Sequence, residues 1–363
     1  LFLGVARMPT PIGLAVVGYA YRKFKRSRGR TKLFWTLALG LVTVMSFGGF
    51  GPLMAEAVRQ FPGLGKLGQV IQEKGGPAVP SVAGGPGGPV RVYFTTPGGV
   101  RVRLVTDTDY VTEAGPTALR AAGVPVVDDR RDALMHNKFM VFDDAAVWTG
   151  SMNFTENCAY RNDNHGLYFA SPELAAVYAA RFRRMFEQRD FGPPSGWSFG
   201  RADVPSGAVT LADGTTVEVT FSPGGKAAQK VTNVVAEATR SVHFLAFSFT
   251  HAGIAQAMLD KARAGVEVRG VFETSQAKSG YSQFGKLAAA RLPVFADANP
   301  RNMHHKLIVV DGRTVVAGSF NFSDNADTQN NENVLVIRNN AAVAERFEGE
   351  FRRVADLAEK APR

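Results

Sequence analysis

Cysteine is nearly missing from this chain of 363 residues, in which Cys158 is the single example. One thiol excludes an internal disulfide framework and a zinc site built from several cysteines. Hydrophobic residues make up 45% of the chain and charged residues 20%, which is ordinary for a globular protein with a sizeable core. The length suits two domains or one large duplicated domain.

A broad excess of positive charge is also missing from most of the chain. The net charge is +10, from 42 Lys and Arg against 32 Asp and Glu. Residues 1–57 hold eight of those basic residues and one of the acidic ones, so residues 58–363 carry about +3. A basic footprint of the kind that binds nucleic acid is therefore not visible in the larger part of the chain.

The amino-terminal segment has the features of an export signal in their usual order. Seven basic side chains within 22–32 precede an uncharged, mainly apolar run at 33–47. The tripeptide Ala55-Glu56-Ala57 then offers the A-x-A pattern that signal peptidase cleaves. We expect residues 1–57 to be a signal peptide or a membrane anchor, with the rest exported across, or held at, a bacterial cytoplasmic membrane. The alternative is a buried core helix with a basic flank.

Beyond this segment the sequence predicts a tethered, duplicated body. Glycine and proline crowd the stretch 75–89, which is typical of a flexible tether. A self-similar pattern in the remainder indicates two repeats. We therefore expect a linker at 58–89, a first repeat at 90–191, a connecting hairpin region at 192–216 and a second repeat at 217–363.

Strand-like and helix-like segments alternate in the second repeat, which indicates an α/β sheet with helical layers. A hairpin is expected over 209–221, with its turn at Asp213-Gly214. Amphipathic helices are expected to close the repeats, at 172–188 and 341–359. Between these limits we expect helices at 226–239 and 251–264, and strands at 217–221, 242–249, 266–272 and 306–310.

The first repeat is expected to be shortened. The segment 94–99 (FTTPGG) resembles 221–225 (FSPGG) but continues directly into VRVR at 100–103. The comparable VEVR at 266–269 is separated from FSPGG by the whole segment 226–265. The counterpart of a helix, a core strand and a second helix is thus expected to be missing. Either this insert is dispensable in the first repeat, or a deletion has removed it.

One constellation of polar residues occurs twice, with every matched pair at the same separation along the chain. It consists of His136, Lys138, Asp143 and Gly150-Ser151-Met152-Asn153, and it recurs as His304, Lys306, Asp311 and Gly318-Ser319-Phe320-Asn321. Each lysine lies two positions after its histidine and shares its face of a strand. The pattern therefore predicts one cluster of two imidazoles, two ammonium groups and two amides.

Such a cluster suits the cleavage of a phosphodiester. One imidazole can attack phosphorus to give a phosphohistidine, while the other donates a proton to the leaving oxygen and later activates water. The ammonium groups, amides and hydroxyls would stabilise charge on the phosphate oxygens. A metal site is disfavoured, because lysines in the same cluster would repel the cation.

The paired HxK(x)4D(x)6GSxN motifs resemble those of the phospholipase D superfamily. The resemblance implies an α/β fold, namely a duplicated αβα sandwich with two pseudo-twofold-related repeats and an active site at their interface. It implies a metal-independent phosphohistidine mechanism with no cofactor, in which His136 and His304 form the catalytic pair and His136 is the nucleophile. It also implies phosphate binding by Lys138, Lys306, Asn153 and Asn321, with Ser151 and Ser319 as further contacts or as turn formers only, and structural roles for Asp143 and Asp311.

One departure from the motif distinguishes the two halves. Glu332 stands where the family places a carboxylate that orients a catalytic imidazole, and Asn164 occupies the matching position of the first repeat. A carboxylate stabilises an imidazolium, whereas an amide only orients the ring. By the resemblance, Glu332 would serve His136 across the repeats. We therefore expect unequal pKa values for His136 and His304, unless the neighbouring Asp163 supplies the missing acid.

Three functions remain open for this motif. The export signal and the nearly neutral body favour a phospholipase D-like enzyme whose partner is a phospholipid or a membrane surface. Repeat two favours a metal-independent endonuclease, because FSPGG, HHKLIVVD, GSFNFS and NNENVLVI resemble the small endonuclease branch, so nucleic acid is a possible substrate. The shortened first repeat and Asn164 suggest a catalytically impaired scaffold. Fold-level kinship does not choose between lipid and DNA.

Overall fold

The computed structural model describes residues 101–192 and 207–361. All of them belong to a compact unit that spans residues 86–363. The expected signal or anchor at 1–57 and the linker at 58–89 lie outside the described residues. Within the described ranges, no helix combines the length and the apolar character that crossing a membrane requires.

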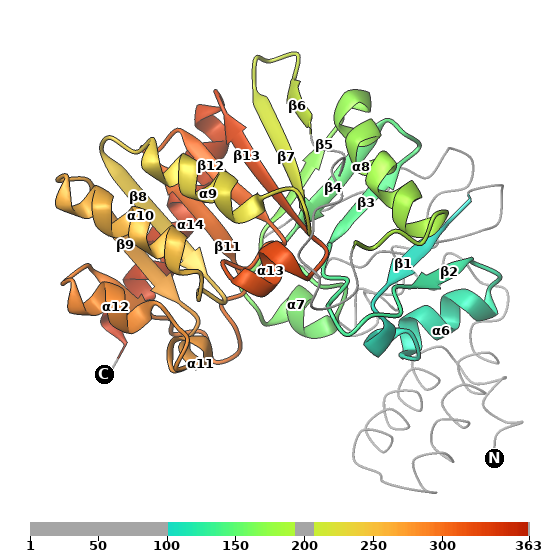
Figure 1. Cartoon of the computed structure of the whole chain (residues 1–363), viewed down its shortest axis with the longest axis horizontal. Helices are drawn as coiled ribbons and strands as arrows, with labels where there is room; N and C mark the ends of the chain where they lie inside the picture. The colour runs from blue at the N-terminus through green and yellow to red at the C-terminus, as the bar shows by residue number, and fades with distance from the viewer. Residues whose placement is uncertain (1–100, 193–206, 362–363) are drawn as a thin grey trace, which may run out of the picture. The chain divides into compact units, whose positions relative to one another are not determined.

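A mixed sheet of eight strands forms the second half of this unit (Figure 1). The strand order is β10-β9-β8-β11-β12-β13-β7-β6. Strands β10, β9 and β8 are parallel, and the other neighbours are antiparallel. The strands are β6 (Gly207–Thr210), β7 (Thr216–Ser222), β8 (Ser241–Ala246), β9 (Glu267–Phe272), β10 (Val294–Ala296), β11 (Lys306–Val310), β12 (Thr314–Gly318) and β13 (Glu332–Arg338).

Helices cover both faces of this sheet, which gives the expected layers. Helices α9 (Ala227–Ala236) and α10 (Ala252–Arg263) pack on one face, and α14 (Ala341–Lys360) packs on the other. In strand β11, Ile308 joins the core under α9 and α10, whereas its neighbour Leu307 joins the core under α14. This alternation follows the two-residue period of a strand and explains why its residues are uniformly apolar. The short helices of this half are α11 (Thr274–Ala277), α12 (Phe284–Ala289) and α13 (Asp324–Thr328).

The described residues of the first half form two smaller sheets, with strand orders β1-β2 and β3-β4-β5. Helix α8 packs against β3 and β4 and contributes to the same core as α14. The elements are β1 (Leu104–Thr106), the 3-10 turn η1 (Thr108–Tyr110), α6 (Ala114–Ala121), β2 (Val126–Asp128), β3 (Phe139–Phe142), β4 (Ala146–Gly150), α7 (Glu156–Tyr160), β5 (Gly166–Phe169) and α8 (Pro172–Phe186).

The order of elements in the first half recurs in the second. Strand β4, helix α7 and strand β2 match β12, α13 and β10, at the same separation along the chain as His136 and His304. In the second half, β8 lies between β9 and β11. Among the described residues of the first half, the matching β1 and β3 belong to separate sheets. This break agrees with the expected loss of a core strand from the shortened first repeat.

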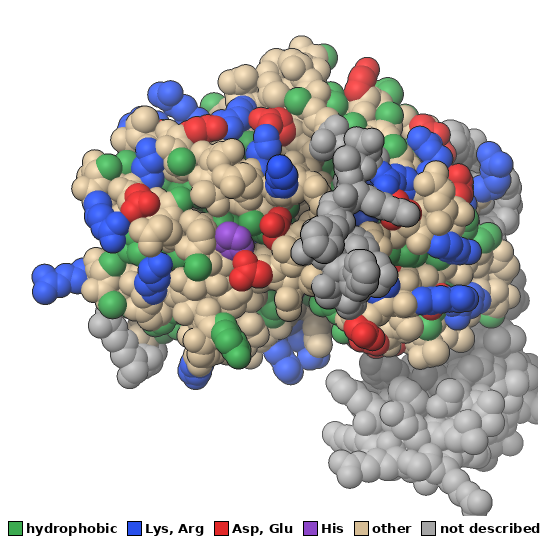
Figure 2. Space-filling view, viewed as in Figure 1, with side chains coloured by type: hydrophobic (Ala, Val, Ile, Leu, Met, Phe, Trp, Pro, Cys, Tyr) green, Lys and Arg blue, Asp and Glu red, His purple; other side chains and the backbone are tan. Residues whose placement is uncertain are grey.

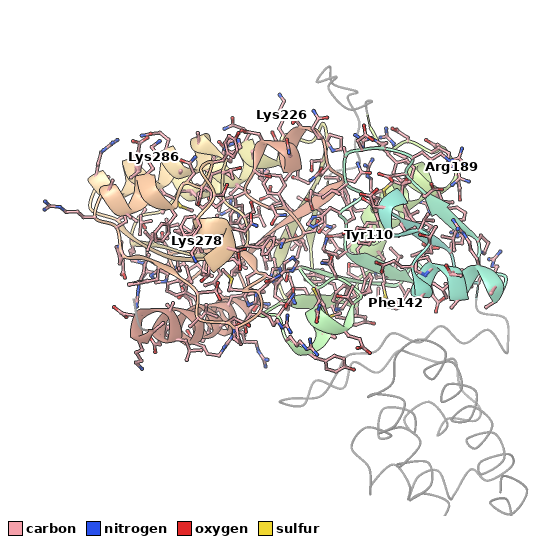
Figure 3. The ribbon with its side chains drawn as sticks, turned by 90° about the horizontal axis from the view of Figure 1, so that it is seen from below. Tyr110, Phe142, Arg189, Lys226, Lys278 and Lys286 are labelled. Carbon is pink, nitrogen blue, oxygen red and sulfur yellow. The ribbon has the colours of Figure 1, made fainter. Side chains whose placement is uncertain are left out.

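The outer face of β3-β4-β5 also differs from its counterpart in the second half. Val336 of β13 lies under the α9 and α10 layer and is 0% exposed. Tyr168 occupies the matching position of β5 and is 51% exposed, with its ring 6.2 Å from that of Phe142. Figure 3 shows Phe142 on the first half, well separated from Lys278 and Lys286 of the second.

The sequence-based elements are largely confirmed. The hairpin of β6 and β7 is present, and Asp213 Oδ1 accepts the Thr215 N–H at its turn. The expected helices at 226–239, 251–264, 172–188 and 341–359 appear as α9, α10, α8 and α14, and the expected strands appear as β7, β8, β9 and β11. The α/β fold class is therefore confirmed.

Candidate active site

The two motif histidines are held by equivalent backbone contacts across the two halves. Met135 forms a parallel bridge with Asn331, and Met303 forms one with Asp163. The His136 N–H donates to the Asn331 carbonyl at 3.0 Å, and the His304 N–H donates to the Asp163 carbonyl at 2.8 Å. Each histidine therefore belongs to one half and is positioned by the other.

Each imidazole also takes its side-chain partner from the opposite half. His136 Nδ1 lies 2.7 Å from Glu332 Oε1, which is the pairing expected from the sequence. His304 Nδ1 lies 2.9 Å from Asn164 Oδ1. The Asn164 amide nitrogen donates to the Cys158 carbonyl at 3.0 Å, so its oxygen faces His304 and accepts the Nδ1 proton. In both rings this leaves Nε2 as the nitrogen available for chemistry.

Asp163 does not replace the missing acid, so that alternative is wrong. Its carboxylate oxygens accept hydrogen bonds from Arg353 at 2.6 Å and from Asn299 at 2.8 Å. Only its main-chain carbonyl meets His304. His304 is thus oriented by the neutral amide of Asn164, whereas His136 faces the carboxyl group of Glu332.

The motif serines support the residues that orient the histidines. The Ser151 hydroxyl donates to Asn164 Oδ1 at 2.9 Å, and the Ser319 hydroxyl donates to Glu332 Oε2 at 2.6 Å. Each hydroxyl also accepts a main-chain N–H, from His165 in one case and Asn333 in the other. Both serines are 0% exposed, so their hydroxyls are occupied within the protein.

The two lysines are buried beside the histidines. Lys138 Nζ donates to the His136 carbonyl at 2.6 Å, and Lys306 Nζ donates to the His304 carbonyl at 3.0 Å. Burial lowers the pKa of Lys138 to about 8 and, together with the charge of Lys138, lowers the pKa of Lys306. Phe247 also lies here, with its ring centroid 4.7 Å from Lys306 Nζ and 4.6 Å from the His304 ring centroid.

Burial and the two ammonium groups hold both imidazoles neutral. Burial first, and then Lys138 and Lys306, lower the pKa of His136 well below its ordinary value. Burial and the same two lysines also lower the pKa of His304. Because both lysines act on both rings, the four side chains share one site. Burial raises the pKa of Glu332 to about 8, although Lys138 and the Ser319 hydroxyl act against this rise.

The motif asparagines follow the serines, at the start of the loops that lead into α7 and α13. Their main-chain carbonyls accept the N–H groups of Thr155 and Ser323, each at 2.8 Å. Asn153 and Asn321 are both partly buried. The Asn321 side-chain oxygen is buried and has no hydrogen-bond partner among the described residues, so this amide retains unused polar capacity at the site.

The motif aspartates lie at the turns that follow β3 and β11, both with positive φ, 49° for Asp143 and 54° for Asp311. The Asp311 carboxylate accepts main-chain N–H bonds from Thr239, Arg240 and Ser241. Partial burial acts to raise its pKa, but these hydrogen bonds lower the pKa to about 2. The three donors to Asp311 lie just before β8 and at its first residue, and β8 has no described counterpart in the first half. The matching Asp143 is exposed. The structural role expected for this position is visible at Asp311.

Several residues near the site were not singled out from the sequence. Phe247 lies between Lys306 and His304, and no motif marks it. Asn333 Nδ2 donates to Asn137 Oδ1 at 3.0 Å between the halves. The sequence signal that could have identified Asn333 is its place in the Asn331-Glu332-Asn333 segment, next to Glu332. Within residues 101–192 and 207–361, no group of three or more His, Cys, Asp and Glu side chains is arranged to hold a metal ion.

The chain is similar in sequence to a known protein family and to several of its members. A family profile described as "Cardiolipin synthase, PLD-like domain" matches residues 95–186 and 231–355, which is more than half of the chain. A phospholipase D of Rickettsia conorii is 32% identical over 121 residues, covering 33% of this chain and 60% of the relative. A mitochondrial cardiolipin hydrolase of Chlamydomonas reinhardtii is 34% identical over 120 residues, covering 33% of this chain and 53% of the relative. The chain therefore spans less than two thirds of the length of either relative.

One solved structure extends the likeness over most of the described fold. A phosphatidylserine synthase from Haemophilus influenzae aligns with a TM-score of 0.54 and 14% identity. The alignment covers 70% of this chain and 74% of that protein. At this identity the likeness concerns the fold alone.

Proposed function

We propose, because this chain belongs to the phospholipase D-like domain family, that it hydrolyses or transfers phospholipid head groups through a phosphohistidine intermediate. The observation that carries the proposal is the exchange of partners between the halves. His136 Nδ1 contacts Glu332 and His304 Nδ1 contacts Asn164, in each case across the two halves. Two buried lysines lie beside them. This arrangement provides two unequal imidazoles, each with its Nδ1 held by a side chain of the other half, beside two ammonium groups.

His136 is the better nucleophile of the pair. Its Nδ1 proton points at Glu332 Oε1, so the Nε2 lone pair is free to attack phosphorus. A phosphorylated imidazole carries positive charge, which favours the ionised form of Glu332 at Nδ1, and the resulting carboxylate stabilises that charge. Glu332 is itself held by the Ser319 hydroxyl. In this scheme Ser319 acts on Glu332 and not on phosphate, and Ser151 has the same relation to Asn164.

His304 serves as the acid and then as the base. A bound phosphodiester anion offsets the lysine charges that lower the pKa of His304 and so favours its imidazolium. In the first step this imidazolium gives the Nε2 proton to the departing alkoxide, and the bond between phosphorus and that oxygen breaks. In the second step the neutral ring takes a proton from the water or alcohol that attacks the phosphohistidine. Its partner Asn164 is neutral, so no carboxylate traps the proton on the ring.

The charges of the site favour an anion. Lys138 and Lys306 carry two ammonium groups, and among the described residues Glu332 is the single carboxyl group paired with His136 or His304. A phosphodiester carries one negative charge, which would offset the excess and relieve the repulsion that lowers the lysine pKa values. Asn153 and Asn321 would donate to the non-bridging oxygens, as a preorganised oxyanion site does.

We propose a phospholipid as the preferred substrate because the chain beyond the amino-terminal segment carries little net positive charge. Residues 58–363 carry about +3, and Figure 2 shows acidic side chains among the basic ones on both halves of the face in view. The export signal or anchor proposed for 1–57 would bring the enzyme to a bilayer. We also propose that this segment directs the enzyme across the cytoplasmic membrane or anchors it there.

The decisive experiment compares the full chain with His136→Ala on two substrates in EDTA. Phosphatidylcholine and phosphatidylglycerol vesicles are offered in one series, and single-stranded and plasmid DNA in the other. We expect head-group release that depends on His136, with DNA left intact. Release that survives in His136→Ala would refute the proposed nucleophile. His251→Ala is the matched control, because His251 caps the start of α10 instead.

Endonuclease activity is the second candidate, because the motif segments of repeat two resemble the small endonuclease branch. DNA cleavage with inert vesicles in the same assay would establish it. Nucleic-acid binding should also weaken steeply as salt rises, because counterions are released from the phosphates. If neither substrate is cleaved, the result favours a catalytically impaired scaffold protein. The function of such a scaffold would survive substitution of His136.

A further inference from the structure

A second pair of buried histidines lies at the contact between the two halves. His165 Nδ1 is 3.2 Å from His305 Nδ1, and the two rings lie edge to edge with 4° between their planes and 5.4 Å between their centroids. At the matching positions of the opposite repeats, Asn333 and Asn137 form a simple amide hydrogen bond. The fold therefore accepts an amide pair at this type of position, so the imidazole pair calls for a further explanation.

The hydrogen bonds around this pair run in one direction. The Gly318 N–H donates to His165 Nε2 at 3.2 Å, so the His165 proton sits on Nδ1 and is donated to His305. His305 then carries its proton on Nε2, which lies 2.8 Å from Glu350 Oε1. A main-chain N–H can only donate and a carboxylate can only accept, so the two ends determine both tautomers.

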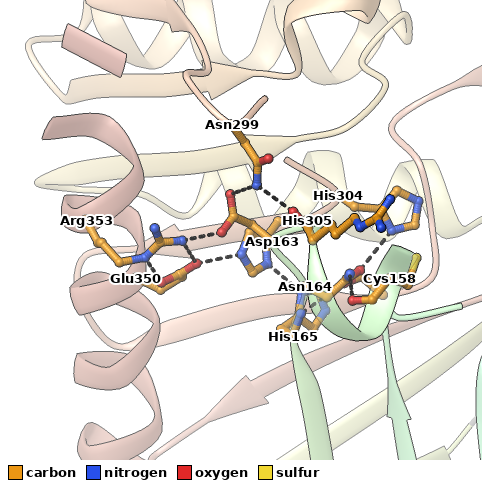
Figure 4. A network of polar contacts seen from close by, with 11 residues as sticks. Cys158, Asp163, Asn164, His165, Asn299, His304, His305, Glu350 and Arg353 are labelled. Carbon is orange, nitrogen blue, oxygen red and sulfur yellow. Dashed lines mark hydrogen bonds and ion pairs between the residues drawn. The ribbon is translucent and has the colours of Figure 1, made fainter. Parts of the chain in front are cut away.

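Helix α14 supplies the charged end of this chain of bonds. Burial acts to raise the pKa of Glu350, but hydrogen bonds from Arg353 and His305 lower the pKa to about 2. Arg353 Nε donates to Glu350 at 2.8 Å, and the same guanidinium donates to Asp163 at 2.6 Å. Figure 4 shows this network running from Arg353 through Glu350 and His305 to His165.

Both ends of the network reach the partners of the motif histidines. Asp163 accepts the His304 N–H and directly precedes Asn164, which holds the His304 ring. At the other end, Gly318 directly precedes Ser319, whose hydroxyl holds Glu332. Gly318 has a φ of 129°, and a Cβ there would lie 2.4 Å from the Asn333 carbonyl oxygen, so this loop has little freedom to shift.

We propose that Glu350, His305 and His165 form a positioning relay that fixes the orientation of the two catalytic imidazoles, His136 and His304, relative to each other. The relay rests on the function proposed above. It acts through Arg353, Asp163 and Asn164 on His304, and through Gly318, Ser319 and Glu332 on His136. None of its three members touches the reacting atoms. The carboxylate of Glu350 is its anchor, because it accepts the Nε2 proton of His305 and, together with the Gly318 N–H, selects the tautomer of both buried rings.

The test compares Glu350→Gln with Glu345→Gln in the full chain, using bis(p-nitrophenyl) phosphate as a soluble diester. Both residues lie on α14, but Glu345 pairs with the exposed Arg352. Groups that hydrogen-bond the ligands of a metal site typically contribute about 10- to 100-fold in activity, and we expect the lower end of this range for Glu350. We expect kcat of Glu350→Gln to fall about tenfold with KM within about twofold. A kcat within about twofold of the wild type would overturn the relay.

Nitrogen NMR provides a readout that a merely structural role would not move. In the wild type we expect the proton of His165 on Nδ1 and that of His305 on Nε2. A proton on Nε2 of His165 would contradict the relay. The double exchange His165→Asn with His305→Asn should make kcat insensitive to Glu350→Gln, because no imidazole tautomer is left to select. A full effect of Glu350→Gln in that background would also contradict it.

The same spectra separate failure of the relay from failure of the proposed function. If the wild type hydrolyses no diester, the function fails, and the nitrogen signals of His136 and His304 then decide the relay. Signals that shift in Glu350→Gln but not in Glu345→Gln support it. Signals that stay unchanged in both variants overturn it. Circular dichroism confirms in each case that the variant is folded.

Discussion

At the scale of single residues, the two motif histidines differ in their partners, which are Glu332 for His136 and Asn164 for His304. Both residues accept the Nδ1 proton of a histidine from the other half. A carboxylate also stabilises a positive ring, whereas an amide does not. We therefore propose different tasks for the two imidazoles, with His136 forming the covalent intermediate and His304 moving protons.

This difference predicts the effect of Asn164→Asp. A carboxylate beside His304 would favour its imidazolium and raise the pKa of His304. Because His304 must be protonated in the first step, the alkaline limb of the kcat/KM profile should move up by about one pH unit or more. The measurement is a pH–rate profile with a soluble diester.

The control for this prediction is Asn157→Asp. It places the same charge on α7, where the residue is exposed and contacts Arg161. Its alkaline limb should match that of the wild type. If Asn164→Asp also left the limb in place, His304 would not be the acid.

At the scale of elements, β8 and β9 carry the central core of the second half. Phe244 of β8 is 0% exposed and stacks edge-on against Phe249 and Phe272. Gly270 of β9 lies directly across from it. A Cβ at Gly270 would lie 2.1 Å from the Phe244 ring, so only glycine leaves room for this ring.

Gly270→Ala should therefore destabilise the protein. Forcing a methyl group into a packed core typically costs about 1–3 kcal/mol. Urea unfolding of the full chain would measure the loss as a lower midpoint. Gly285→Ala is the control, because this glycine of helix α12 has open space around its Cβ position. That variant should be neutral or more stable, since alanine favours a helix by about 1 kcal/mol over glycine.

Elements were easier to predict than their neighbours in space. Periodicity found α9, α10, α8 and α14 because each is a long amphipathic helix. The short strand β10 and the short helices α11 and α12 were missed, since such brief segments carry too little pattern. The partition of the first half into two sheets could not be read at all, because strand order depends on long-range pairing.

At the scale of the whole molecule, each half holds the motif histidine of the other half. The main-chain bonds of His136 and His304 cross between the halves, and so do their side-chain partners. Burial at this junction keeps His136, His165 and His304 neutral by lowering their pKa values. The junction should therefore be the part of the fold most sensitive to acid.

Stability should fall as the pH drops below about 6.5, the ordinary pKa of histidine. A histidine whose pKa is lowered by folding binds its proton first in the unfolded chain, so acid favours unfolding. Glu332 acts in the opposite sense, because its pKa of about 8 lets the folded protein keep a proton that the unfolded chain releases. Three histidines outweigh this one carboxyl group.

We expect the free energy of unfolding to drop by about 1–2 kcal/mol between pH 6.5 and 5.5. Urea midpoints at a series of pH values would measure the change. The variant His165→Asn lacks one buried imidazole and should show a shallower dependence. Equal slopes for the variant and the wild type would mean that His165 does not contribute.

The sequence by itself determined the composition of the site and the class of the fold. A motif repeated at one constant separation identified both histidines, both lysines and the position of Glu332, because local spacing is written in the chain. Tertiary structure decided which groups meet. It brought Asn164 and not Asp163 to His304, turned the two serines toward their orienting partners, and joined Glu350 of α14 to His305. Such contacts arise only when strands and helices far apart in sequence pack together, and no local pattern records them.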